Sequence, residues 1–244
     1  METLVDETMY SFLEDGSRGG VSQISRRHAR ANNKYLDDYK PDEATVYLIY
    51  LDAVNLYGKV IVDSLTTHGF RWLPKIDWSI LIEKNKMGNW QIKKDLDLDG
   101  QDGFILEVDM KIPKELHDET NCYPLAPEDL EITEDMLSKY QKENFPKQYK
   151  KSSKKLTPNL LDKKRYAVHL KNLKFYQDKG IIVTKVHRVL TFKQSKWLKS
   201  YIEFNTARRN EATSDFARDY YKLLNNAVFG KFVIKMFKIT AENT

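Results

Sequence analysis

The pattern of hydrophobic and polar residues changes character near residue 46. Residues 1–45 are polar, contain a Gly-Gly turn and end in an extended linker. The run from Val46 to Leu51 consists of Val, Tyr, Leu and Ile, which predicts a strand buried on both faces. It ends at Asp52, and a helix-like NLYGKV stretch follows. Because burial of an unpaired carboxylate is costly, we expect Asp52 at a solvated strand tip, hydrogen-bonded or holding a cation.

Strand-like and loop-like segments alternate through the middle of the chain. Gly69 and Pro74 indicate loops after the helical stretch. Gly88–Pro113 predicts a β-hairpin or a longer β-loop, because alternating runs surround a DLDLDGQDG turn. Arg165–Phe192 predicts a helix that ends at a cap on Gly180 and is followed by a strand.

The last third of the chain predicts two helices, and the second of them has two distinct faces. One face carries two cations, an amide and an aromatic ring within about 80° of one another, namely Arg218, Lys222, Asn226 and Phe229. The opposite side is apolar and is expected to pack, namely Phe216, Tyr220, Leu223 and Ala227. The pattern is typical of an ordinary amphipathic helix, and it also suits a nucleoside triphosphate, with cations for the phosphates and a ring beside the base. Arg208 and Arg209 come near the same face if the two helices form a hairpin.

Charge adds a second candidate surface. Forty Lys and Arg against 35 Asp and Glu give a net charge of +5, which does not by itself predict nucleic-acid binding. Lys139–Lys174, however, contains twelve bases, two acids and interleaved aromatic residues. This segment is interpreted either as a groove that tracks phosphates and stacks bases or as a solvated loop.

Other motifs exclude several classes of protein. A single cysteine, Cys122, excludes an internal disulfide framework and suits an intracellular protein. The start of the chain lacks the features of a signal peptide, and no apolar run reaches the length of a membrane span, so we expect a soluble chain with no membrane partner. Asp95, Asp97 and Asp99 begin a calcium-loop pattern, but Leu106 occupies the position of its last acid. A turn is the better interpretation.

Two motifs and a Gly-Gly pair occur in an informative order. Asp52–Tyr57 follows the pattern Asp, two residues, Ser or Asn, Leu and Tyr, and Lys222–Gly230 follows Lys, three residues, Asn-Ser, one residue and Tyr-Gly. Arg18–Gly20 is similar to a Gly-Gly template-binding motif. With Tyr123–Glu128 and His187–Asn205, these motifs resemble the protein-primed family B DNA polymerases of phages, adenoviruses, linear plasmids and Polinton (Maverick) transposons.

The resemblance implies an α+β fold with a palm sheet, helical fingers and a subdomain inserted between the first and second polymerase motifs. It divides the chain into a template-binding lead-in (1–45), palm (46–75), inserted subdomain contacting DNA and terminal protein (76–170), palm return (171–192), fingers (193–231) and the start of further palm (232–244).

The resemblance also implies roles for single residues. Asp52 is similar to the first metal-binding and catalytic aspartate, which holds Mg²⁺, with two ions per site in the complete enzyme; a helix N-cap is the alternative for Asp52. Tyr57 resembles the steric gate against a 2′-hydroxyl, and Lys222 resembles the lysine that grips the incoming phosphates. The other nucleotide-binding candidates are Asn55, Leu56, Arg209, Arg218, Asn226 and Phe229, and the DNA-binding candidates are Arg18, Gly19, Gly20, Gly230, Lys150, Lys151, Lys154 and Lys155.

Three departures from the family pattern limit the expected activity. Ala227 replaces the usual serine, Phe229 replaces the usual tyrosine, and nothing after Gly230 resembles the third motif, Tyr-x-Asp-Thr-Asp. We therefore expect a DNA-directed DNA polymerase fragment that is inactive alone, with a DNA template-primer, dNTPs and a terminal protein as partners. Its expected location is intracellular, and nuclear if the source is a eukaryotic transposon. The alternative is an inactive or domesticated remnant that only binds DNA.

Overall fold

The computed structural model describes residues 2, 4–26, 28–53, 55–144 and 154–241, with the side chains of the last helix described as far as Val228. The chain divides into two compact units. Unit 1 comprises residues 1–3, 26–69 and 193–244, and unit 2 comprises residues 4–25 and 70–192. The units follow contacts within the chain, and the segment boundaries that the resemblance implies stay predictions.

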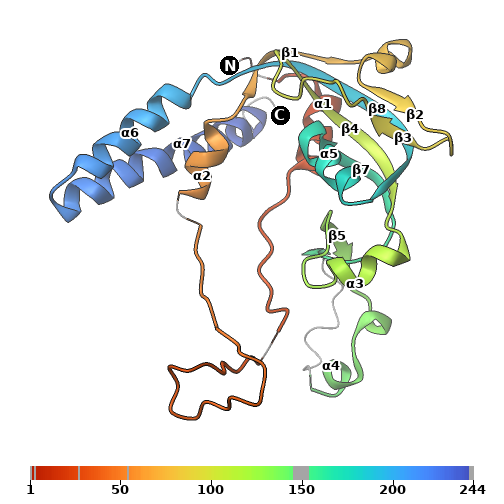
Figure 1. The fold of residues 1–244 in the computed structure, drawn as a ribbon. Coiled ribbons are helices and arrows are strands. Elements are labelled where there is room, and N and C mark those ends of the chain that lie inside the picture. Colours follow the sequence, from red (N-terminus) through yellow and green to blue (C-terminus); the bar gives the residue numbers. More distant parts are fainter. Residues whose placement is uncertain (1, 3, 27, 54, 145–153, 242–244) are drawn as a thin grey trace. The chain divides into compact units, whose positions relative to one another are not determined.

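The chain combines an antiparallel sheet with several helices, as expected for an α+β protein (Figure 1). The described strands are β1 (Leu65–Trp72), β2 (Ile82–Lys84), β3 (Trp90–Ile92), β4 (Asp102–Lys111), β5 (Glu128–Glu131), β6 (Lys154–Thr157), β7 (Lys163–His169) and β8 (Ile182–Ser195). The described helices are α1 (Glu7–Gly16), α2 (Leu56–Ile61), α3 (His117–Thr120), α4 (Lys139–Asn144), α5 (Leu170–Asp178), α6 (Lys199–Glu211) and α7 (Asp215–Ala241), with 3-10 helices η1 (Lys75–Ile80), η2 (Lys114–Leu116) and η3 (Glu134–Met136).

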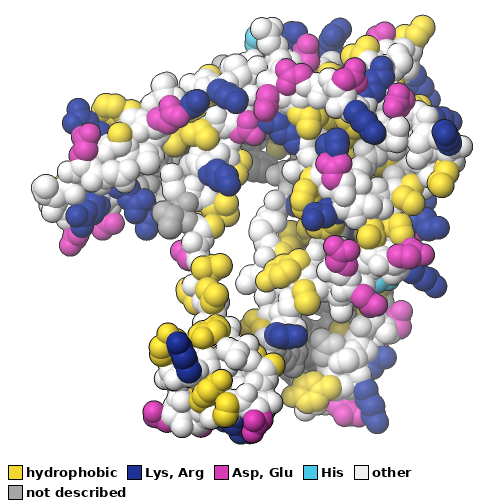
Figure 2. Space-filling view, viewed as in Figure 1, with side chains coloured by type: hydrophobic (Ala, Val, Ile, Leu, Met, Phe, Trp, Pro, Cys, Tyr) yellow, Lys and Arg dark blue, Asp and Glu magenta, His cyan; other side chains and the backbone are white. Residues whose placement is uncertain are grey.

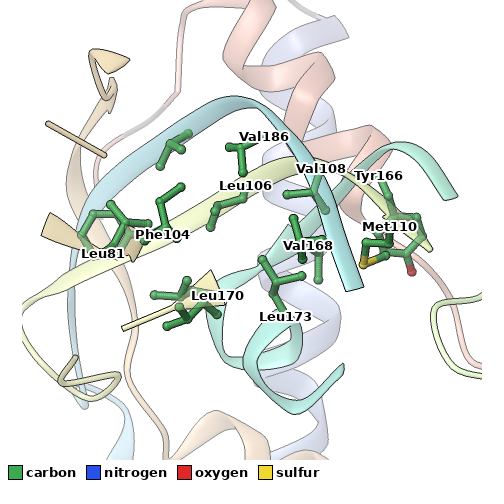
Figure 3. Close-up of a cluster of buried hydrophobic side chains, with 14 of the residues drawn as sticks. Leu81, Phe104, Leu106, Val108, Met110, Tyr166, Val168, Leu170, Leu173 and Val186 are labelled. Carbon is green, nitrogen blue, oxygen red and sulfur yellow. The ribbon is translucent and has the colours of Figure 1, made fainter. Parts of the chain in front are cut away.

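Unit 2 is built on an antiparallel sheet in which β4 has a neighbour on each side. The described strands run in the order β2-β3-β8-β4-β7, and β1 also pairs with β8. Leu106, Val108 and Met110 of β4 point into the main core, where Leu173 of α5 packs with them (Figure 3). On the other face, Phe12 of α1 packs in a second, smaller cluster. The sheet therefore lies between two helices, with a polar part of the second face left for other contacts.

One prediction for unit 2 is confirmed. A helix, a glycine and a strand follow one another as α5, Gly180 and β8, and Gly180 has a φ of 97° that suits glycine. The helix begins at Leu170 rather than at Arg165, because the preceding residues pair with β4 as β7. α1 was not predicted. The loop predicted at Gly69 is wrong, because β1 runs through this residue, whereas Pro74 lies outside any helix or strand, as expected.

Of the two alternatives predicted for Gly88–Pro113, a β-hairpin or a longer β-loop, the hairpin is wrong. Its two strands exist as β3 and β4, but β8 lies between them in the sheet. The alternating pattern identified strands correctly, but it carries no information about which strands are neighbours. The DLDLDGQDG segment between them is a turn, as expected, in which the Asp97 carboxylate accepts the backbone N–H of Asp99 at 2.9 Å and Lys171 pairs with Asp99 at 2.6 Å.

In unit 1 the two predicted C-terminal helices are confirmed as α6 and α7, which form a hairpin. The strand predicted for Val46–Leu51 is wrong. Only Val46 makes a β-bridge, to Asn32, and the side chains after it are exposed, with Tyr50 at 95% and Leu51 at 86%. A strand is buried only where other strands flank it, and the described residues of unit 1 supply none beside this segment.

The packing of the main core predicts that shortening a buried side chain of β4 lowers the free energy of unfolding substantially. Leu106→Ala is expected to lower the free energy of unfolding of unit 2 by about 2–5 kcal/mol, because Leu106 is fully buried between α5 and the sheet. Urea denaturation followed by tryptophan fluorescence measures the change, with exposed Leu161→Ala as the matched control. Equal stabilities of the two variants would contradict the assigned core.

Candidate nucleotide and nucleic-acid interface

The first polymerase-like motif forms a tight entry into α2. Asn55 precedes the helix with a left-handed φ of 55°, and its carbonyl accepts the N–H of Lys59 at 3.0 Å. The Asn55 side chain lies directly against the Cα of buried Gly58, where any Cβ would collide with it. Gly58 therefore allows the Asn-Leu-Tyr-Gly sequence to close this turn, which leaves the Tyr57 side chain more than half exposed.

Asp52 lies in the extended, exposed segment before α2, where Figure 2 shows hydrophobic side chains at the surface. Among the described residues, no three His, Cys, Asp or Glu side chains come close enough together to hold a metal ion. Asp52 can supply one carboxylate, and Mg²⁺ commonly takes further ligands from nucleotide phosphates and water.

The second polymerase-like motif lies on α7, in the same unit as α2. α2 contacts both α6 and α7. Between the two long helices, buried Asn225 donates from Nδ2 to the hydroxyl of Thr206 at 3.4 Å. Asn225 thus lies on the side of α7 that meets α6, whereas Lys222 and Asn226 are exposed.

Arg218, which was predicted to lie on the same face, is bound at the start of α7. Its guanidinium donates to the Ala212 carbonyl at 3.2 Å and pairs with Asp215 at 3.1 Å. Arg209 is half-buried near the end of α6. The side chain of Phe229 and the position of Gly230 in the site lie outside what the structure describes.

The prediction that the apolar face of α7 is packed is wrong. Phe216 is 82% exposed and Leu223 is 64% exposed, and the rings of Phe216 and Tyr220 stack at a centroid distance of 6.4 Å. The face towards α6 instead contains Asn225, which the hydrophobic pattern could not select because it is polar. The sides of α7 next to its contact with α6 therefore carry exposed side chains.

In unit 2, Arg18 has structural contacts near the edge strand β7. Its guanidinium lies 3.8 Å from the ring centroid of Tyr166 and donates to the carbonyls of Ala167 at 2.8 Å and Gly16 at 3.1 Å. Gly19 and Gly20 lack a positive φ, and a Cβ on either would meet no described atom within 4 Å. The fold itself thus gives no reason for these glycines, and their predicted role in template binding stays a prediction.

The basic segment does not form one continuous element. Lys150 and Lys151 lie outside the described residues, whereas Lys154 and Lys155 are exposed on β6, which pairs with β5. Lys163 is fully buried, and its amine donates to Glu128 at 2.7 Å. Burial lowers the pKa of Lys163, and the Glu128 carboxylate only partly offsets this effect.

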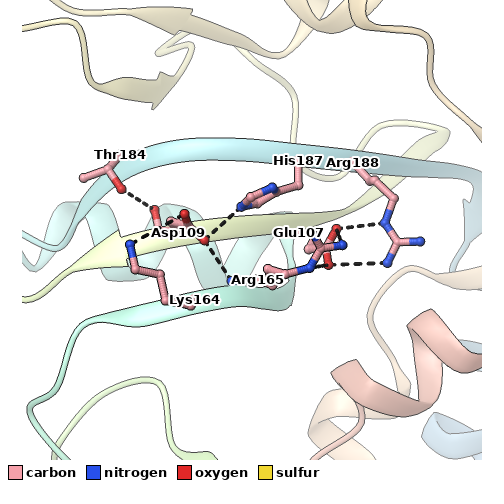
Figure 4. A network of polar contacts seen from close by, with 7 residues as sticks. All are labelled: Glu107, Asp109, Lys164, Arg165, Thr184, His187 and Arg188. Atoms are coloured by element: carbon pink, nitrogen blue, oxygen red, sulfur yellow. Dashed lines mark hydrogen bonds and ion pairs between the residues drawn. The ribbon is translucent and has the colours of Figure 1, made fainter.

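Sequence analysis missed a polar network on the second face of the unit 2 sheet (Figure 4). Glu107 of β4 is 5% exposed and pairs with Arg165 at 3.1 Å and with Arg188 at 2.8 Å. Two residues further along β4, Asp109 accepts from the backbone N–H of Arg165 and contacts His187, both at 2.9 Å. FILEVDM alternates apolar and acidic residues, and this row of acids on one face of a strongly apolar strand was the signal that could have revealed the network.

The Asp109 carboxyl makes the stability of unit 2 depend on pH. Burial alone would raise the pKa of Asp109, but the Arg165 N–H, the His187 ring and the charge of Lys164 together hold it below the ordinary value. A lowered carboxyl pKa stabilises the fold above the ordinary carboxyl range and loses this contribution as the pH falls. The stability of wild type is therefore expected to fall more steeply than that of Asp109→Asn between about pH 5 and pH 3. Urea denaturation at each pH measures this, and parallel pH profiles would contradict it.

No helix within the described residues is long and apolar enough to cross a membrane. Comparisons of the chain with protein-family models, with curated proteins and with solved structures find no match. The function is therefore inferred from the chain's own residues and their arrangement.

Proposed function

We propose that this chain is the nucleotide-binding part of a DNA-directed DNA polymerase of the protein-primed family B type. The observation that supports the proposal best is the contact of α2 with both α6 and α7 in unit 1. This packing holds the Asp52–Tyr57 motif and the Lys222–Gly230 motif in one compact unit. Their residue types are those that the transfer of a deoxynucleotide to a primer 3′-hydroxyl requires.

Each exposed side chain has a specific task in this proposal. The Lys222 amine donates to the oxygens of the incoming triphosphate, and Asn226, one turn further along α7, lies towards the nascent base pair. The Tyr57 ring packs beneath the sugar and excludes a 2′-hydroxyl. Asp52 would supply one carboxylate to a Mg²⁺ ion, which when bound would activate the attacking hydroxyl and stabilise the leaving oxygen.

A remnant that binds DNA without catalysis is the second candidate function. One observation favours it: within the described residues Asp52 is not accompanied by the further carboxylates of a metal site. Nucleotide binding separates the two candidates, because a remnant that only binds DNA has no reason to retain affinity for a triphosphate.

The lysine on α7 provides the direct test. Lys222→Ala is expected to weaken binding of a fluorescent dNTP in the presence of Mg²⁺ by roughly tenfold to hundredfold, the loss of a charge-assisted contact to phosphate. Lys199→Ala, on the exposed surface of α6, is the matched control and is expected to bind as wild type does. Equal affinities of the two variants, or no binding by wild type, would remove the proposed nucleotide site.

Sugar selection tests Tyr57 separately. Tyr57→Val is expected to reduce the preference for a dNTP over the matching ribonucleotide by roughly tenfold or more, since the ring that collides with the 2′-hydroxyl is lost. Competition binding with both nucleotides measures the ratio. Tyr220→Val, another half-exposed tyrosine of unit 1, is the control. A sugar preference that Tyr57→Val leaves unchanged would assign Tyr57 a purely structural role.

A further inference from the structure

The second face of the unit 2 sheet holds two guanidinium groups on one carboxylate. Glu107 is almost fully buried, and its two oxygens receive four contacts of 2.8–3.4 Å from Nε and Nη2 of Arg165 and Arg188. Both guanidinium groups meet at this carboxylate (Figure 4). With four donors around it, the Glu107 carboxylate has little capacity to accept more.

The two arginines retain donors that Glu107 does not use. A guanidinium has five N–H donors, and each arginine directs its Nε and Nη2 at Glu107, which leaves Nη1 for another acceptor. The Arg165 side chain is 63% exposed and that of Arg188 is 40% exposed. Two cations that share one anion repel each other, so a second anion beside them is favourable.

Neighbouring groups hold these arginines in place. The Arg188 guanidinium lies 4.8 Å from the ring centroid of Trp72 and 5.0 Å from that of Phe12, in a cation–π arrangement. Lys164 lies 3.7 Å from Asp109, whose other contacts are with His187 and the Arg165 N–H. Three cations, Lys164, Arg165 and Arg188, thus face two carboxylates, Glu107 and Asp109, which leaves at least one excess positive charge.

The backbone is distorted where Arg165 enters this cluster. The β4–β7 register shifts between Val108 and Met110, so both Lys164 and Arg165 stand opposite the single residue Asp109. Arg165 has a φ of 48°, a left-handed conformation that is strained for a residue with a side chain. Bulges and strained residues of this kind concentrate at functional sites, and this one places two adjacent basic side chains on the same face.

We propose that Arg165 and Arg188, held by buried Glu107 and assisted by Lys164, bind the phosphodiester backbone of a nucleic acid. Arginine suits this role because its planar fork contacts two phosphate oxygens at once. The anion-binding geometry stands on the contacts within unit 2. The identification of the anion as nucleic acid rests on the proposed function, since a polymerase must hold a template-primer.

Oligonucleotide binding tests the proposal on the full chain. Arg165→Gln combined with Arg188→Gln is expected to weaken binding of a fluorescent single-stranded or duplex DNA at least tenfold at about 0.1 M salt, and to reduce the slope of log affinity against log salt by about 1–2. The control pair Lys86→Gln and Lys94→Gln removes the same charge from exposed lysines of unit 2 and is expected to leave most of the affinity. Equal losses in both pairs, or no loss in the first, would overturn the proposal.

Two further variants keep the test decisive. If the double variant fails to fold, which circular dichroism reveals, Arg165→Gln alone serves, because Arg188 still pairs with Glu107. Arg165→Lys keeps the charge but loses the fork, so it is expected to weaken DNA binding several-fold, whereas an unchanged affinity would overturn the bidentate contact.

Competition distinguishes the sources of phosphate. Unlabelled oligonucleotide is expected to displace the probe at far lower phosphate concentration than inorganic phosphate or a dNTP does. Equal displacement by a dNTP would identify a free nucleotide as the ligand and overturn the nucleic-acid assignment. The dNTP affinity of Arg165→Gln, measured in parallel, is expected to equal that of wild type, so failure here is distinguishable from failure of the Lys222 site.

Discussion

The requirement that a buried carboxylate be paired governs unit 2. Glu107 and Asp109 lie on β4, between β7 and β8, and neither could remain charged there without partners. β7 supplies Arg165, and β8 supplies His187 and Arg188. The same pairings join three strands, occur at the register shift opposite Asp109 and hold the guanidinium groups of two arginines. The pairing of these two buried carboxylates thus contributes both to the sheet of unit 2 and to the proposed anion site.

Local sequence patterns predicted the helices and strands better than they predicted which strands lie side by side in the sheet. The succession of α5, Gly180 and β8 and the α6–α7 hairpin were readable from the sequence, because helix periodicity and a glycine with positive φ are local properties. The separation of β3 from β4 by β8 depends on contacts distant in sequence, so the alternating pattern of Gly88–Pro113 could not reveal it. The Glu107 network was missed for the same reason, since its cations come from two other strands.

In unit 1 the hydrophobic pattern predicted burial that does not occur. Hydrophobicity predicted burial for Val46–Leu51 and for the Phe216 side of α7, yet both are exposed. Among the described residues of unit 1, the buried apolar side chains are Ile61 and Ile202, so hydrophobic residues greatly outnumber the places available to bury them. The side of α7 that meets α6 instead contains buried Asn225, which contacts Thr206, and Lys222 and Asn226 are exposed. The candidate nucleotide site depends on this orientation and on the packing of α2.

The most direct measurement of the central claim is a crystal structure of the chain with a dNTP and Mg²⁺. The account predicts the triphosphate within hydrogen-bonding distance of Lys222 Nζ, the sugar against the Tyr57 ring, and the Asp52 carboxylate on the metal side of the phosphates. A triphosphate bound away from α2 and α7, or crystals grown at saturating nucleotide with none bound in unit 1, would contradict the assignment of unit 1 as the nucleotide-binding part of a polymerase.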